Sequence, residues 1–206
     1  MEQHSDRCSA FRLRNNRLPP TNENDAETWY NWAKNQSCRP AEQPYPKSQE
    51  DLIRIVNEAR EKGKKVRCAG TGHSWSSSSV TDGVLVMVEM MTKIYPPEKS
   101  AEGWTVQVET GVTVKKLDHF LREHEPQLAM PSNVVLESVR YGGVLSLGCH
   151  GAATQTQTLA DLVCEVKIID AHGNPNTFTQ EKDAEEFSAA CINLGLLGVI
   201  YSYTLR

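Results

Sequence analysis

Residues 64–75 place the strongest constraint on the fold, because a short apolar run there breaks into glycines and ends on a histidine and a serine run. The run from residue 65 to 69 predicts a buried strand. Gly70 and Gly72 carry no Cβ atom, so a ligand can approach the backbone and consecutive N–H groups can face an anion. The stretch therefore predicts a phosphate-binding loop, with an ordinary turn and a solvated His73 as the alternative.

This loop is neither of the two common phosphate-binding motifs. No Gly-Lys-Ser/Thr follows it, which excludes a P-loop, and the third glycine and the helix of a Rossmann turn are missing. The loop sequence by itself therefore leaves the ligand open.

Composition narrows the class of protein. The 206 residues can bury a real core as one domain or two small subdomains, and a net charge of −4 without any Lys/Arg block argues against a nucleic-acid partner. No apolar run reaches the ~18 residues that span a bilayer, so we expect no transmembrane segment. The polar N-terminus has no signal-peptide pattern, and six widely spaced cysteines indicate mostly buried thiols in a reducing compartment. These features favour a cytoplasmic location.

The N-terminal part differs in composition from the rest of the chain. Residues 1–40 are polar, and only the aromatic cluster at 29–32 can pack, so we expect a partly irregular arm with a short strand or turn near Trp32. Ser48 then begins a helix that Gly63 ends, with apolar residues at helical spacing between them. Together with the strand at 65–69 and a second at 84–88, this helix predicts a small α/β unit.

After residue 97 the pattern changes to alternating apolar and polar residues. The segment from Pro131 to Ala153 has little periodicity and many small residues, and we expect it to be structureless and functional. The other expected elements are strands at 104–109, 163–170, 176–180 and 199–205, a helix capped by Thr113, and a helix from 183 to about 193.

Two glycine-rich segments far apart in the sequence thus call for one explanation. A large flat cofactor with a pyrophosphate needs one loop to hold the phosphates and one run of small residues to let a ring system lie against bare backbone. Flavin adenine dinucleotide (FAD) fits this description.

Seven motifs occur along the chain in this order: Asn31-Trp32, Cys38-Arg39-Pro40, 46–52, Ala69 to Ser74, Thr110-Gly111-Val112, Gly143 to Gly151, and 194–205. In that order they resemble the FAD-binding domain of the PCMH-type, or vanillyl-alcohol oxidase, superfamily, and most of all its sugar-lactone and alditol oxidase branch. The resemblance covers about residues 30–206. It implies an α+β fold of two α+β subdomains, about 41–97 and 98–206, with the cofactor between them.

The resemblance also implies site residues. His73 is the candidate for a covalent bond to the flavin, and Val199 and Ile200 either contact the adenine side or are plain core. His150 either contacts the flavin or is a core imidazole bonded to backbone. Ser138 would hydrogen-bond the flavin, although it lies slightly further upstream of Gly143 than the family's serine. The implied FAD-binding residues are Gly70, Thr71, Gly72, His73, Ser74, Ser138, Gly142, Gly143, Ser146, Gly148, His150, Gly151, Val199 and Ile200.

The implied activity is oxidation of a sugar lactone or polyol by hydride transfer to FAD, with oxygen or another acceptor taking the electrons. Enzymes of this branch are longer, so we expect their C-terminal substrate domain to be absent from this chain, and no catalytic base can be named. The alternative is a truncated or non-catalytic flavin-binding remnant that acts through a partner, and a third hypothesis is an interaction module whose exposed C-terminal edge awaits a second chain. No metal-ligand spacing occurs in the sequence.

Overall fold

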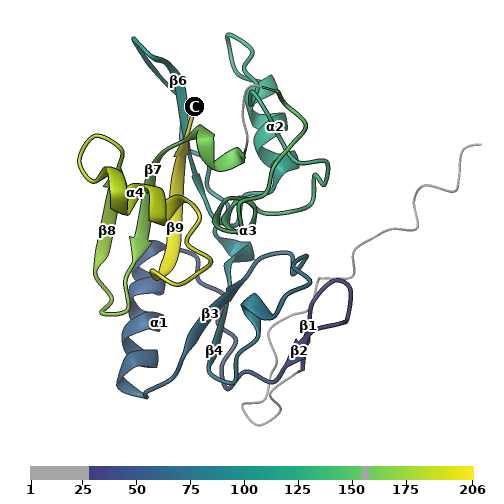
Figure 1. Cartoon of the computed structure of the whole chain (residues 1–206), viewed down its shortest axis with the longest axis vertical. Coiled ribbons are helices and arrows are strands. Elements are labelled where there is room, and N and C mark those ends of the chain that lie inside the picture. The colour runs from purple at the N-terminus through teal and green to yellow at the C-terminus, as the bar shows by residue number, and fades with distance from the viewer. Residues whose placement is uncertain (1–27, 155–157) are drawn as a thin grey trace, which may run out of the picture.

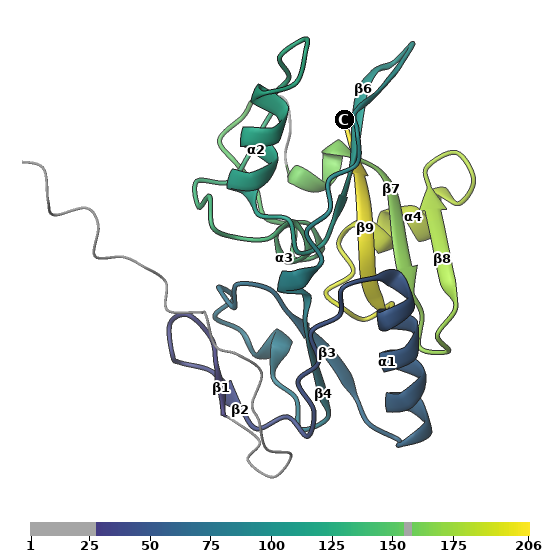
Figure 2. The same ribbon diagram turned by 180° about the vertical axis from the view of Figure 1, so that it is seen from behind.

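The computed structural model describes residues 28–154 and 158–206, so the first 27 residues of the expected arm, with Cys8, lie outside the described residues. The strands are β1 Trp29–Tyr30, β2 Ser37–Cys38, β3 Val66–Ala69, β4 Val84–Met87, β5 Glu98–Ser100, β6 Gly103–Glu109, β7 Val163–Ile169, β8 Pro175–Thr179 and β9 Val199–Leu205. The helices are α1 Gln49–Glu61, α2 Val114–Arg122, α3 Tyr141–Ser146 and α4 Ala184–Cys191. Figures 1 and 2 show β1 to β4 with α1 in one half of the molecule and β5 to β9 with α2 and α4 in the other, while α3 lies at the boundary.

The strands form separate sheets. β3 and β4 pair in parallel, from Val66 opposite Val84 to Ala69 opposite Met87, and β1 and β2 form an antiparallel pair. The other strands make one antiparallel sheet in the order β5-β6-β9-β7-β8, so the last strand of the chain lies in its middle. Sheet membership changes between β4 and β5, and a division into two subdomains near residue 97 stays a prediction.

The predicted helix from Ser48 is confirmed as α1. The Ser48 hydroxyl accepts a hydrogen bond from the Asp51 N–H at 3.2 Å, which caps the first turn. The buried face of α1 packs against residues of β4 and against the adjoining ends of β7 and β9. α1 therefore ties the two halves of the molecule together. Its buried residues are Leu52, Ile55, Val56 and Ala59.

The larger core lies between the five-stranded sheet and the helices α2, α3 and α4. Thr113 caps α2 as predicted, because its hydroxyl accepts a bond from the Lys116 N–H at 3.2 Å. Tyr203 of β9 and Tyr141 of α3 are among the largest fully buried side chains. This core fixes where α3 lies relative to the sheet.

The expectation of a structureless segment from Pro131 to Ala153 is wrong for its middle part, where α3 forms. Gly142 and Gly143 have low helix propensity, so the helix was not predicted. The backbone explains it, since the Gly142 N–H donates to the Thr110 carbonyl at 3.0 Å and a Cβ on Gly142 would lie 2.8 Å from the Thr110 Cβ. Tertiary packing against Thr110, the residue after β6, thus requires glycine at position 142 of this helix.

The described cysteines are free thiols, but only Cys191 is buried, whereas Cys38, Cys68, Cys149 and Cys164 are half-buried. The expectation of mostly buried thiols is corrected accordingly. Among the described residues, no helix has both the length and the apolar character needed to cross a bilayer.

Candidate functional site

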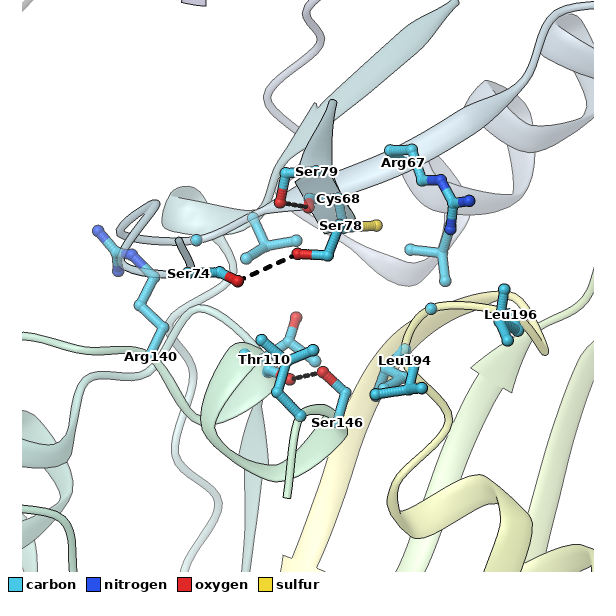
Figure 3. A pocket seen from close by; sticks show the side chains of 18 of the residues that line it. Arg67, Cys68, Ser74, Ser78, Ser79, Thr110, Arg140, Ser146, Leu194 and Leu196 are labelled. Carbon is cyan, nitrogen blue, oxygen red and sulfur yellow. Dashed lines mark hydrogen bonds between the residues drawn. The ribbon is translucent and has the colours of Figure 1, made fainter. Parts of the chain in front are cut away.

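A cavity of about 1030 Å³ lies at the boundary between the two halves of the molecule. β3 and the loop after it form one side, and α3 with the segment before it forms the opposite side (Figure 3). The segment 194–200, which leads into β9, closes one end. The two glycine-rich stretches singled out in the sequence therefore face one another across a single space.

The loop after β3 presents bare backbone to this cavity. Gly72 adopts φ = +69°, and a Cβ there would lie 3.2 Å from Trp29 Cζ2, so both the conformation and the packing favour glycine. Among the described residues, no acceptor is found for the N–H groups of Thr71, Gly72 and His73. Successive N–H groups without acceptors beside a cavity are typical of an anion-binding site.

The opposite wall is open because α3 turns a glycine toward the cavity. A Cβ on Gly143 would meet nothing within 4 Å, in contrast to its neighbour Gly142. Ser146 also lines the cavity, although its hydroxyl is already used, since it donates to the Gly142 carbonyl at 2.6 Å. This wall can accept a flat group lying against backbone.

The end of the cavity is apolar. Leu194, with φ = +53°, and the glycines at 195 and 198, with φ = +72° and +139°, form an irregular loop. This loop leaves Leu194, Leu196 and Leu197 50%, 70% and 44% exposed on the cavity wall. Sequence reasoning did not assign these leucines, and the signal that could have found them is an apolar run interrupted by two glycines.

Val199 and Ile200 lie behind this loop. They line the cavity but are only 4% and 7% exposed, and each belongs to a hydrophobic core cluster. They are therefore core residues at the cavity wall, and their contact with the adenine side stays a prediction.

Arg67 and Arg140 lie on the cavity wall, and neither was predicted. Arg67 extends from β3 toward the 194–198 loop (Figure 3), and no partner for its guanidinium is found in the part of the chain that the structure describes. Arg140, just before α3, donates from Nη1 to the Gly111 carbonyl at 2.5 Å, and its Nη2 lies 3.8 Å from Glu89. Its Nε is buried without a partner among the described residues, and burial lowers the pKa of Arg140.

Three implied site residues lie off the cavity wall. Ser138 instead accepts a hydrogen bond through its carbonyl from the Thr71 hydroxyl at 3.0 Å. Gly148, with φ = +64°, packs against Ile192, and a Cβ on Gly151 would lie 2.6 Å from the Ser132 hydroxyl. The implied residues on the wall are Gly70, Thr71, Gly72, His73, Ser74, Gly142, Gly143, Ser146, His150, Val199 and Ile200.

Two histidines line the cavity. The His150 side chain is exposed and its Nδ1 lies 3.1 Å from the Gly151 carbonyl, so the alternative of a core imidazole is wrong. His73 stacks on Trp32 with ring centroids 4.5 Å apart and an angle of 16° between the planes. The sequence did not predict this stack, since the two residues are far apart along the chain.

Within residues 28–154 and 158–206, no group of three or more His, Cys, Asp or Glu side chains is arranged to hold a metal. Burial raises the pKa of the Cys68 thiol to about 12, so this cavity-lining group stays neutral at physiological pH.

Comparison with known proteins gives consistent results. A model of the FAD binding domain family matches residues 43–178. L-gulonolactone oxidase of Mus musculus is 31% identical over 176 residues, which make up 85% of this chain and 39% of the relative. D-arabinono-1,4-lactone oxidase of Eremothecium gossypii is 29% identical over 178 residues, 85% of this chain and 33% of the relative. The chain thus spans well under half the length of the curated relatives it matches.

Solved structures agree on the fold. The crystal structure of cholesterol oxidase from B. sterolicum superposes with a TM-score of 0.71 at 20% sequence identity, over 87% of this chain and 36% of that one. The predicted α+β fold of the PCMH-type FAD-binding domain is therefore confirmed.

Proposed function

The chain belongs to the family of FAD binding domains, and on that premise we propose that its cavity holds one FAD molecule. One observation carries the proposal: the loop at residues 71–73, whose N–H groups have no acceptor among the described residues, lines the same cavity as the open wall at Gly143. Such N–H groups suit a pyrophosphate, and the open wall suits a flat ring system.

The other residues of the cavity wall support a proposal of contacts with particular parts of FAD. The exposed leucines of the 194–198 loop and the buried pair Val199 and Ile200 would cover the adenine side, and Arg67 lies next to them. His150 and Ser146 would lie along the flavin and its ribityl chain. Arg140, rather than Ser138, is on the wall at the start of α3, so we propose that it takes the place of the implied serine.

We further propose that His73 bonds covalently to the flavin. Forming that bond takes one hydrogen from the flavin methyl carbon and one from the imidazole nitrogen. Two electrons pass with these hydrogens to dioxygen, which becomes hydrogen peroxide. A covalent link raises the flavin potential and prevents loss of the cofactor, which suits an oxidase.

Acid precipitation of the FAD-loaded chain tests the covalent link. Flavin should stay in the pellet of the wild-type chain and of His150→Ala, but pass into the supernatant with His73→Ala, since His150 also lines the cavity but is not the proposed tether. All three proteins should fold, because neither imidazole belongs to the core. Acid-stable flavin in His73→Ala would contradict the assignment.

We propose an oxidoreductase activity of the lactone oxidase type, in line with the names of the relatives. The flavin supplies the hydride acceptor for the C–H bond of a sugar lactone or polyol, and oxygen or another acceptor takes the electrons. We assign no catalytic base to the described residues. Anaerobic addition of L-gulono-1,4-lactone or D-arabinono-1,4-lactone to the loaded chain should bleach its visible flavin absorbance.

A second candidate is a flavin-holding chain that acts with a partner. It is favoured by the apolar cavity rim, where Val135 is 93% exposed and Leu196 70% exposed. This candidate predicts bound flavin that neither lactone bleaches until the partner is added.

A further inference from the structure

The segment from β1 to β2 lies against the glycine loop that follows β3. The Trp32 N–H donates to the Gly72 carbonyl at 2.8 Å, and Asn31 Nδ2 donates to the Ser74 carbonyl at 2.9 Å. Further along, Asn35 Nδ2 donates to the Trp75 carbonyl at 3.2 Å. The β1–β2 hairpin, residues 29–38, thus holds the loop through three of its carbonyls.

The hairpin is itself rigidly built around Asn31. This side chain is 3% exposed, accepts from the Gln36 N–H at 3.0 Å and donates to Asn35 Oδ1 at 2.7 Å. Trp29 packs against the loop from the same hairpin, 3.2 Å from where a Cβ on Gly72 would lie. A buried amide with its bonds satisfied fixes the geometry of the segment that carries it.

Trp32 occupies a position that core packing does not explain. Its side chain is 54% exposed, yet its ring lies nearly parallel to the imidazole of His73, with centroids 4.5 Å apart. An exposed indole placed face to face with a single histidine restricts that ring more than it buries apolar surface. The stack covers one face of the His73 imidazole, and His73 also lines the cavity.

We infer that the β1–β2 hairpin holds the His73 loop in place and that Trp32 is a positioning residue that fixes the orientation of the imidazole at the cavity wall. Gly72, at φ = +69°, gives the loop a backbone that is intrinsically free to move, so the imidazole needs an outside support to keep one orientation. A reacting group held in one orientation reacts faster than one that samples many. The link to flavin attachment rests on the proposed function, whereas the positioning of His73 does not.

The first test measures the imidazole itself, without FAD. In proton NMR spectra, the ring current of a stacked indole shifts the imidazole C–H signals of His73 upfield, and His73→Ala assigns those signals. Trp32→Ala should abolish the shift and Trp32→Phe should retain part of it. Tyr30→Ala, which removes another exposed aromatic of the same hairpin, should leave the signals unchanged.

The second test measures flavin attachment during reconstitution with FAD. Trp32→Ala should bind as much total FAD as the wild-type chain but form acid-stable flavin on the order of tenfold more slowly. Trp32→Phe should recover most of the rate, and Tyr30→Ala should match the wild-type rate. A structural role alone would lower total FAD and stability together and would leave the fraction attached unchanged.

The two tests distinguish a failure of the positioning role of Trp32 from a failure of the covalent bond at His73. Wild-type signals of His73 in Trp32→Ala, or an unchanged attachment rate with total FAD unchanged, would overturn the positioning role of Trp32. If the wild-type chain binds FAD but none is acid-stable, the covalent proposal fails, and the NMR comparison then decides the positioning role of Trp32.

Discussion

At the residue scale, two neighbouring glycines of α3 have different roles. Gly142 is required by the fold, since a Cβ there would lie 2.8 Å from the Thr110 Cβ and 3.0 Å from its carbonyl oxygen. Gly143 faces the cavity with open space around its Cβ position. Only the second should therefore be able to accept a side chain without loss of the fold.

A substitution at Gly143 should separate folding from cofactor binding. Gly143→Leu should fold but bind FAD about tenfold or more weakly, because overpacking a filled site costs about 1–3 kcal/mol. Gly143→Ala should bind FAD and gain up to about 1 kcal/mol in free energy of unfolding, because alanine favours a helix over glycine. Isothermal titration with FAD and urea denaturation measure the two quantities. Equal FAD affinity in Gly143→Leu and the wild-type chain would place the cofactor elsewhere.

At the element scale, α1 joins the two halves of the molecule. Its buried face packs against Val84 and Val86 of β4 on one side and against Ile169, Val199 and Tyr201 on the other. Two strands alone are marginal in water, so the strand pair β3-β4 depends on α1 on one face and on a smaller cluster with Trp29 and Tyr45 for its other buried residues. The position of the glycine loop relative to α3 thus depends on α1.

Leu52 should show this dependence most clearly, since it is 0% exposed. Leu52→Ala should lower the free energy of unfolding by about 2–5 kcal/mol through the lost burial and the cavity left behind. The exposed Glu61 at the end of the same helix serves as control, and Glu61→Ala should change stability by less than about 0.5 kcal/mol. Urea denaturation followed by circular dichroism measures both, and similar small effects would show that α1 is not part of the core.

Some of the helices could be predicted from the sequence, whereas α3 and the order of the strands could not. α1 and α2 were predicted with their caps because Ser48 and Thr113 act within a few residues of themselves. α3 was missed because the reason for it is a contact with Thr110, far away along the chain. The order β5-β6-β9-β7-β8 likewise depends on pairing between distant strands, which local patterns do not encode.

Several residues predicted for the site lie on the cavity wall where glycines expose backbone, and their binding of FAD stays a prediction. The loop from Gly70 to Ser74 and the glycine at 143 were found by pattern and resemblance, and they line the cavity. Arg67 and Trp32 were missed as site residues because their roles depend on where separate segments meet. Ser138 was implied by the family resemblance, although it lies further upstream of Gly143 than the family's serine, and Arg140 lies on the wall instead.

At the scale of the whole molecule, the cavity lies at the boundary of the two halves, so a bound ligand would contact both. A ligand that binds only the folded chain stabilises it, by about 2.7 kcal/mol when its concentration is one hundred times its Kd. Bound FAD should therefore stabilise the folded chain in addition to its chemical role. The relatives that share this region include L-gulonolactone oxidase and D-arabinono-1,4-lactone oxidase, and the chain covers 39% of the length of the first and 33% of the second.

The most direct test of the central claim is the absorption spectrum of the purified chain after incubation with FAD and removal of the free cofactor. The account predicts a flavin spectrum corresponding to one FAD per chain, and a much weaker one for Gly143→Leu prepared in the same way. A folded, colourless wild-type chain that takes up no FAD would contradict the account.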